Sequence, residues 1–229
     1  DIDGNTTDVL TEHIKEAEVW ITPLDDWLVP TERGYRVNKA LLAQHISNEE
    51  DGNLIFVNQT FWKYENGLWE RMEDGQVKSQ IHRVISDRKD ALGCLTSALV
   101  DDIFKQLGMI LMVPRGFSFN QNPMVLNFTN GVLDLEEGKF SNLHQRELFQ
   151  NIQFPFDFDR DQKCPQWLEF LKSLKFDDET VMRLQEWVGY CLLPRVIGTL
   201  QKSLFFIGEG SNGKSVFLET IASVLDNVS

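Results

Sequence analysis

Residues 208–215 read Gly208-Glu209-Gly210-Ser211-Asn212-Gly213-Lys214-Ser215, and this stretch decides how the last part of the chain is expected to fold. It matches the phosphate-loop pattern G-x-x-x-x-G-K-[ST] at every fixed position. The apolar run Ser203–Ile207 precedes it and is suited to a buried strand, and Val216–Leu225 follows with apolar residues at helical spacing. This order of strand, loop and helix predicts the first β-loop-α unit of an α/β P-loop (AAA+-like) core.

The residue types in this loop suit the binding of a nucleoside triphosphate and Mg²⁺. Glycines let the backbone curl so that successive N–H groups point inward, and the start of the helix adds the positive end of its dipole. Lys214 can reach the β- and γ-phosphates and is the catalytic candidate, while the Ser215 hydroxyl is the candidate Mg²⁺ ligand. The expected nucleotide-binding residues are Gly208, Glu209, Gly210, Ser211, Asn212, Gly213, Lys214 and Ser215.

The motif alone indicates only an NTPase, and two other functions stay open. The chain could belong to a different P-loop enzyme, such as a nucleotide kinase or another AAA+-like motor, which would have a different sequence after the loop. It could also be a non-enzymatic oligomerisation or DNA-loading module whose glycine-rich turn carries an incidental lysine. Replacing Lys214 by alanine would leave the activity of such a module intact.

Several stretches resemble one family. With Asn212 before Gly213-Lys214-Ser215, the loop is similar to that of superfamily 3 helicases of the phage/plasmid primase-helicase family, which also resembles the poxvirus primase-helicase. The chain upstream looks like the domain that precedes the motor in that family, and the resemblance covers roughly Val37 to the end. The matching stretches there are Asn130-Gly131-Val132-Leu133-Asp134-Leu135, Phe156-Asp157 through Cys164-Pro165, Trp167–Leu171, Leu184–Leu193 and Lys202–Ser215.

This resemblance implies an ATP- and Mg²⁺-dependent replicative DNA helicase that forms a homo-oligomeric ring, usually a hexamer, and moves along single-stranded DNA. A primase or primase-polymerase domain often precedes it in the same polypeptide. The chain starts at Asp1 rather than Met, which indicates a fragment, and ends at Ser229, before the Walker B strand, the sensor and the arginine finger of the family. We therefore expect this segment alone to hydrolyse ATP negligibly.

The overall charge argues against a simple nucleic-acid binder. The 229-residue chain has a formal net charge of -13 at pH 7, whereas a DNA-gripping surface is basic. We therefore expect the part before the loop to make protein–protein contacts, such as those of a ring collar. No apolar run reaches the roughly 18 residues of a membrane span, and no secretory signal is present. A bacterial host cytoplasm is the expected location, without a membrane partner.

The expected organisation has three parts. Residues 1–36 form a polar segment, with a weak helical pattern in 1–18 and a loop over Val19–Arg36. Residues 37–200 form an α+β accessory domain of helices and β-hairpins, winged-helix-like in content, with a sub-boundary near Asn120–Pro123. Residues 201–229 begin the truncated P-loop domain. The expected helices are Val37–Ile46, Gln76–Asp87, Lys89–Leu107, Pro165–Leu174 and Asp178–Leu193, and the expected strands are Leu54–Val57, Thr60–Glu65, Leu68–Met72, Met124–Phe128, Val132–Leu135, Phe140–Leu143 and a further one in Phe149–Phe154.

The other chemistry-bearing residues receive plainer interpretations. Asp157, Asp159 and Asp161 alternate as in a calcium loop, but Gln162 stands where glycine is needed and Leu168 where a bidentate glutamate belongs, so a solvated turn is expected.

Neighbouring carboxylates point in different directions, so Asp25-Asp26 and Asp101-Asp102 are expected to be solvated surface rather than a primase metal site. The aromatic residues of the 60–69 segment are expected to pack in a core rather than stack on nucleobases. The cysteines Cys94, Cys164 and Cys191 are expected to be small buried residues, and the histidines His13, His45, His82 and His144 lack metal-ligand spacing.

Overall fold

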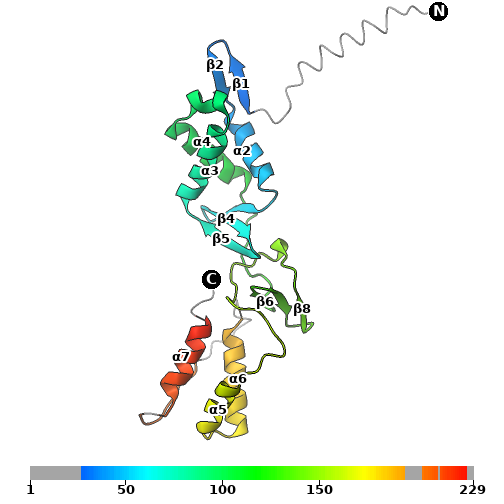
Figure 1. Cartoon of the computed structure of the whole chain (residues 1–229), viewed down its shortest axis with the longest axis vertical. Helices are drawn as coiled ribbons and strands as arrows, with labels where there is room; N and C mark the ends of the chain where they lie inside the picture. Colours follow the sequence, from blue (N-terminus) through cyan, green and yellow to red (C-terminus); the bar gives the residue numbers. More distant parts are fainter. Residues whose placement is uncertain (1–26, 194–202, 211, 226–229) are drawn as a thin grey trace, which may run out of the picture. The chain divides into compact units, whose positions relative to one another are not determined.

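The computed structural model describes residues 27–193, 203–210 and 212–225. The chain divides into two compact units: unit 1 holds the described residues up to Lys63 together with Arg71–Pro114, and unit 2 holds Tyr64–Glu70 and the described residues from Arg115 onward. Both contain helices and small antiparallel sheets (Figure 1). The predicted α+β character is therefore confirmed. The expected helical pattern in residues 1–18 and the expected start of the P-loop domain at residue 201 lie outside the described residues.

Unit 1 begins with a hairpin where the sequence predicted a loop. Strands β1 (Leu28–Thr31) and β2 (Gly34–Val37) pair antiparallel, with Leu28 opposite Val37. The loop prediction was wrong for this half of Val19–Arg36. Proline disfavours a strand only where its missing N–H would have to pair, and each strand of a two-stranded ribbon has an unpaired edge that can accommodate Pro30. Leu28 and Val37 are both buried, so the hairpin is anchored to the core of the unit.

Three helices build the core of unit 1, and two of them start later than the sequence predicted. Helix α2 (Lys39–Glu49) starts after Asn38, whose side-chain oxygen accepts a hydrogen bond from the N–H of Leu41 at 3.2 Å. The single helix expected over Lys89–Leu107 is broken into the 3₁₀ helix η1 (Lys89–Cys94) and helix α4 (Ser97–Ile110). The break occurs because Thr96 is extended and caps α4, its hydroxyl oxygen accepting from the N–H of Leu99 at 3.1 Å.

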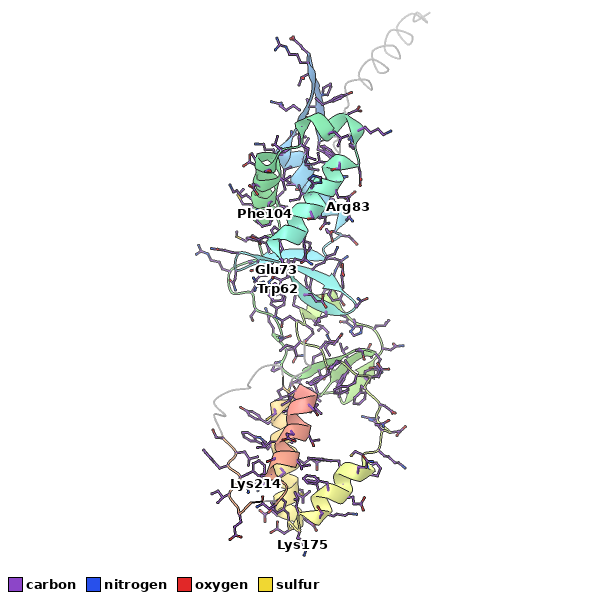
Figure 2. The ribbon with its side chains drawn as sticks, turned by 60° about the vertical axis from the view of Figure 1, so that its left-hand side comes forward. Trp62, Glu73, Arg83, Phe104, Lys175 and Lys214 are labelled. Atoms are coloured by element: carbon purple, nitrogen blue, oxygen red, sulfur yellow. The ribbon has the colours of Figure 1, made fainter. Side chains whose placement is uncertain are left out.

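Helix α3 (Asp74–Ser86) starts earlier than the sequence predicted, since Asp74 and Gly75 lie in its first turn rather than closing the hairpin before it. Helix α4 packs against both α2 and α3, and apolar residues of all three helices join one buried cluster; Figure 1 shows the three helices grouped together. Figure 2 labels Phe104 of α4, whose ring packs edge-on against the buried ring of Phe61 at 5.0 Å between centroids. The most buried apolar side chains of this core are Leu42, Ile46, Phe61, Ile81, Ile85, Ile103 and Leu107.

The central meander was predicted correctly. Strands β3 (Leu54–Val57), β4 (Thr60–Glu65) and β5 (Leu68–Met72) lie in the order β3-β4-β5. The two-residue turn Asn66-Gly67 has φ values of 50° and 85°, as the primed hairpin turns require. Phe61 and Trp69 are almost fully buried, while Trp62 and Tyr64 are partly buried, which confirms core packing for the first pair.

Unit 2 contains a second antiparallel sheet. Strands β6 (Val125–Phe128), β7 (Gly131–Asp134) and β8 (Lys139–Ser141) lie in the order β6-β7-β8. The further strand expected in Phe149–Phe154 does not form. Instead, the 3₁₀ helix η2 (Arg146–Leu148) leads into Phe149, whose φ of 47° turns the chain, and only Phe154 bridges back to Phe128.

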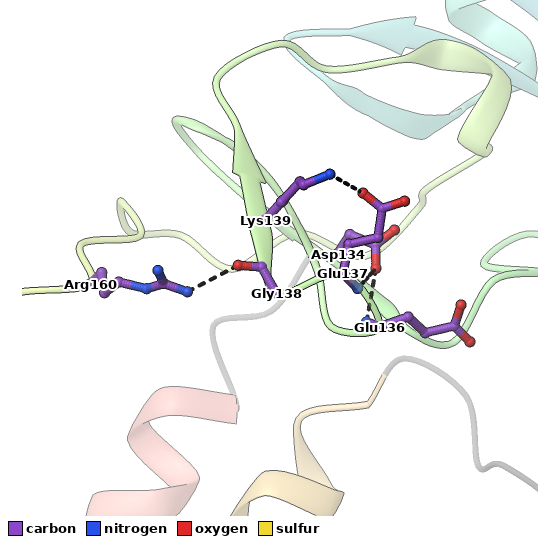
Figure 3. Close-up of polar contacts among 6 residues, drawn as sticks. All are labelled: Asp134, Glu136, Glu137, Gly138, Lys139 and Arg160. Carbon is purple, nitrogen blue, oxygen red and sulfur yellow. Dashed lines mark hydrogen bonds and ion pairs between the residues drawn. The ribbon is translucent and has the colours of Figure 1, made fainter.

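Three residues of the resembling stretch 130–135 have clear structural roles in unit 2. Both polar groups of the Asn130 side chain bond the backbone of Phe158, at 3.1 and 2.8 Å. Gly131 has a φ of 148°, and a Cβ there would collide with the carbonyl oxygen of Ser141. Figure 3 shows the turn that follows, in which the carboxylate of Asp134 accepts from the N–H groups of Glu136 and Glu137 at 2.8 and 2.9 Å. These residues therefore hold the β7–β8 hairpin in shape.

Three helices complete unit 2. Helix α5 (Pro165–Ser173) begins with a proline in its first turn, and α6 (Asp178–Cys191) is capped by Asp177, whose carboxylate accepts from the N–H of Thr180 at 2.7 Å. Helix α7 (Lys214–Leu225) follows the candidate phosphate loop. These three helices lie close to where the sequence predicted them. None of the helices in the described part of the chain combines the length and apolar composition needed to cross a lipid bilayer.

Candidate nucleotide-binding site

The segment before the loop differs from the prediction. Ser203–Ile207 is not a strand, and the side chains of Phe205 and Ile207 are 80% and 95% exposed. A buried strand needs hydrogen-bonded neighbours, and none of the strands described elsewhere in the chain pairs with this segment. Phe206 has an apolar partner, with its ring 5.1 Å from that of Phe217 on α7. The buried-strand prediction is therefore wrong for the chain as described.

The helix after the loop forms as predicted. Helix α7 starts at Lys214, and the N–H of Phe217 donates to the carbonyl oxygen of Gly213 at 3.0 Å, which closes the first helical turn. Phe217 is 3% exposed. Lys214 and the exposed Ser215 thus occupy the first turn of α7, where the positive end of the helix dipole favours an anion.

The ammonium of Lys214 folds back over the loop. Its Nζ donates hydrogen bonds to the carbonyl oxygens of Gly208 and Glu209, at 2.9 and 2.8 Å, and to Oδ1 of Asn212 at 2.7 Å. A lysine has three donors, so the loop oxygens use all of them. In Figure 2 Lys214 lies at the N-terminal end of α7. These hydrogen bonds bring Gly208, Glu209 and Asn212 together around the ammonium of Lys214, the catalytic candidate.

Two loop glycines have side chains close to their Cα. At Gly208 an added Cβ would meet Nδ2 of Asn212. At Gly213, where φ is 83°, it would lie 2.7 Å from Cδ2 of Leu174, at the end of α5. Gly210 has open space around its Cα, and Ser211 lies outside the described residues. The positive φ of Gly213 and the apolar side chain beside it both favour glycine at that position.

Nothing in the sequence pointed directly to the contact between α5 and the loop. Leu174 is the helical-conformation C-cap of α5 and lies four residues after Phe170, so the two side chains share one face. This spacing predicts an apolar face but does not identify what covers it. Gly213 lies over both residues, which are therefore added to the candidate site.

The remaining candidates lie apart from the loop. Asp101 and Asp102 pair with different cations, Lys78 at 2.8 Å and Lys39 at 2.6 Å, which confirms that neighbouring carboxylates point in different directions. These two pairings raise the pKa of Lys78, mainly through its hydrogen bond to Asp101, and lower the pKa of Asp102, mainly through its hydrogen bond to Lys39. Asp101 and Asp102 therefore do not converge on one point.

The three alternating aspartates form a polar turn. Asp157 accepts from the hydroxyl of Thr129 at 2.6 Å, and Asp159 accepts from the N–H of Asp161 at 2.9 Å. Within residues 27–193, 203–210 and 212–225, no group of three or more His, Cys, Asp or Glu side chains could hold a metal ion. The aspartates thus serve the turn that precedes α5.

The cysteines and histidines have separate surroundings. Cys164 is exposed, contrary to the prediction, because it occupies the capping position before Pro165 in the turn that starts α5. Cys191 is partly buried, and this burial raises the pKa of its thiol.

His45 pairs with Glu49 at 3.2 Å and His82 lies 3.1 Å from the Ser86 hydroxyl. His13 lies outside the described residues, and His144 covers Gly67 in the β4–β5 turn.

Comparison with known proteins identifies the family of the region that precedes the loop. The family model described as "D5 N terminal like" matches residues 39–175. No curated protein sequence matches the chain. The matched region contains the helices of unit 1, both three-stranded sheets and α5, and it ends just before α6. Since the match covers more than half of the chain, the chain belongs to the D5 N-terminal-like family, whose domain is part of D5-like primase-helicase proteins and is consistent with a role in replication.

Proposed function

We propose that the chain is part of an ATP-dependent replicative DNA helicase of the primase-helicase type, from a phage or a plasmid. The observation that carries this proposal is the loop 208–215, in which the ammonium of Lys214 lies 2.7–2.9 Å from three loop oxygens at the start of α7. A domain of the D5 N-terminal-like family precedes this loop. The combination supports a nucleotide-driven replication protein.

ATP and Mg²⁺ are the proposed ligands of the loop. Backbone N–H groups of residues 208–215 and the N-terminus of α7 would surround the phosphates. Lys214 would exchange a loop oxygen for a phosphate oxygen, and the exposed hydroxyl of Ser215 would bind Mg²⁺. Bound Mg²⁺ supplies charge neutralisation during phosphoryl transfer. The residues of this chain hold and orient the triphosphate.

Single-stranded DNA and further copies of the protein are the proposed partners. In this proposal the full-length protein forms a ring in the cytoplasm of a bacterial host, and the family resemblance implies six subunits. The acidic charge of the chain favours contacts between proteins over contacts with DNA phosphates. The domain before the loop would therefore contribute to a ring collar.

The experiment that tests this proposal uses the full-length protein. Light scattering should detect a hexamer-sized species, and a forked DNA substrate should be unwound only when ATP and Mg²⁺ are present. Replacing Lys214 by alanine should abolish unwinding, whereas replacing Lys172, an exposed lysine of α5, should leave it unchanged. Unwinding that survives the loss of Lys214 would show that the loop is incidental.

A further inference from the structure

Helix α5 lies directly against the backbone of the phosphate loop. A Cβ at Gly213 would lie 2.7 Å from Cδ2 of Leu174 and 3.2 Å from Cε2 of Phe170. These distances place both side chains beside the backbone at Gly213. Figure 2 shows Lys214 and Lys175, the residues next to this contact, at the same end of the α5–α7 arrangement.

A second contact joins the same face of α5 to helix α7. The ring of Trp167 lies 5.4 Å from that of Phe217, centroid to centroid. Trp167, Phe170 and Leu174 follow one another at spacings of three and four residues, so they form one face of α5. This face therefore contacts both the last glycine of the loop and the helix that the loop starts.

Few other contacts to the loop are found among the described residues. Phe205 and Ile207, just before it, are exposed, and no described strand pairs with their segment. The hydrogen bonds of Lys214 are internal to the loop. The α5 face is thus the main apolar surface that the described loop residues rest on.

From these contacts we propose that α5 is a platform that sets the shape of the phosphate loop, with Phe170 and Leu174 as positioning residues for nucleotide binding. This inference rests on the proposed function. A loop held in its binding shape before the ligand arrives loses less conformational freedom on binding, which strengthens affinity. Removing either side chain leaves the loop's chemistry unchanged but releases its backbone at Gly213.

The platform gives the D5 N-terminal-like region a direct part in the nucleotide site. Helix α5 is the last helix within the matched residues 39–175, whereas the loop lies beyond them. An apolar cavity of about 410 Å³ is lined by residues of α5, α6 and α7 that include Trp167, Val188 and Ile221. Coupling between two sites is reciprocal. Nucleotide binding at the loop should therefore change the surroundings of the α5 side chains.

Binding of Mg²⁺ with the β,γ-imido analogue of ATP to the 229-residue chain tests the platform by calorimetry. Phe170→Ala and Leu174→Ala should each raise the dissociation constant about tenfold, since loop ordering then accompanies binding. The conservative variants Phe170→Leu and Leu174→Met should restore most of the affinity. Met182→Ala is the matched control, because Met182 is a large apolar residue of α6 that is 58% exposed.

A spectroscopic measurement on the wild-type chain checks the coupling without relying on truncated side chains. With 5-fluorotryptophan incorporated, the ¹⁹F resonance of Trp167, assigned through Trp167→Phe, should shift when the nucleotide analogue is added. The resonance of Trp27, buried in the core of unit 1, should stay in place. The shift is a signature that a purely structural role of α5 would not produce.

The outcomes separate this inference from the proposed function. If the wild-type chain binds no nucleotide, the proposed function fails and the platform fails with it. If the wild-type chain binds but Phe170→Ala and Leu174→Ala bind as tightly as Met182→Ala, or the Trp167 resonance does not move, the platform alone is overturned. A raised dissociation constant in both alanine variants, together with the Trp167 shift, supports it.

Discussion

The Nζ of Lys214 donates a hydrogen bond to Oδ1 of Asn212 over 2.7 Å. Its two other hydrogen bonds go to backbone carbonyl oxygens, so Asn212 provides the one partner that can leave without a change in the backbone. A phosphate oxygen can be bound by Lys214 only when one of these three bonds is given up. Under the proposed function, Asn212 would therefore compete with the nucleotide for the ammonium.

Replacing Asn212 by alanine should tighten the binding of Mg²⁺–ATP. The empty loop loses one charge-assisted hydrogen bond, whose exposed position reduces its strength, so the expected gain in affinity is about threefold to tenfold. Asn212→Asp should weaken binding, because its carboxylate both retains the ammonium and repels phosphate. Calorimetry measures both, with Asn142→Ala, an exposed asparagine of the same unit, as the control. Tenfold weaker binding by Asn212→Ala would instead mean that Asn212 contacts the nucleotide.

Truncating Ile103 should strongly destabilise the chain. This side chain is 0% exposed on the face of α4 that packs in the core of unit 1. Ile103→Ala removes buried methyl groups and leaves a cavity, which costs about 2–5 kcal/mol of unfolding free energy. Met109→Ala on the same helix is the control, since Met109 is 66% exposed, and it should change stability by no more than about 0.5 kcal/mol. Urea denaturation followed by circular dichroism measures both, and equal losses would contradict the assigned core.

The cap of α4 should be measurable in the same way. The hydroxyl oxygen of Thr96 accepts from the N–H of Leu99 at 3.1 Å, and Thr96→Ala leaves this donor without its partner. The expected loss is about 1 kcal/mol of unfolding free energy, whereas Thr96→Ser retains the acceptor and should lose little. If Thr96→Ala unfolds at the wild-type urea concentration, Thr96 does not start a helix, and the break between η1 and α4 needs another cause.

The cap of α6 should make stability depend on pH at the acidic end. Hydrogen bonds from Thr180 lower the pKa of the Asp177 carboxyl below its ordinary value. A carboxyl whose pKa is lower in the folded than in the unfolded chain stabilises the fold above its unfolded pKa, and this contribution is lost as pH falls through the folded pKa. With an ordinary pKa of about 3.9, the loss should begin below pH 4.

Thermal unfolding of the wild type and of Asp177→Asn across pH 2 to 6 measures this dependence. Asparagine can still cap the helix but does not titrate. The difference between the melting temperatures of the two proteins should therefore shrink or change sign below pH 4. Parallel curves over the whole range would show that Asp177 has the same pKa in the folded and unfolded chain.

Local patterns predicted the elements whose geometry is encoded in adjacent residues. Asn66-Gly67 marks the β4–β5 turn because both residues accept positive φ, and the acidic residue Asp177 marks the start of α6. The hairpin β1–β2 was missed because Pro30 suggests a loop unless its strand is known to lie at an edge. Thr96 was overlooked because apolar spacing continues through the break between η1 and α4.

Features that depend on distant partners could not be predicted from the sequence. An apolar run such as Ser203–Ile207 becomes a buried strand only beside other strands, and no described strand pairs with it. The residues of the loop match the phosphate-loop pattern, but their role as a nucleotide site and the ability to bind ATP stay predictions. The contact of Gly213 with Phe170 and Leu174 could not be predicted, because helical spacing identifies the apolar face of a helix but not the segment that packs on it.

The central claim is that the loop 208–215 holds Mg²⁺–ATP through the ammonium of Lys214. The most direct measurement is a calorimetric titration of the chain with Mg²⁺ and the β,γ-imido analogue of ATP, comparing the wild type with Lys214→Ala and with Lys172→Ala. We predict binding of one nucleotide per chain in the wild type and in Lys172→Ala, and a loss of at least about a hundredfold in affinity in Lys214→Ala. No heat of binding in the wild type, or equal affinity in Lys214→Ala, would contradict the claim.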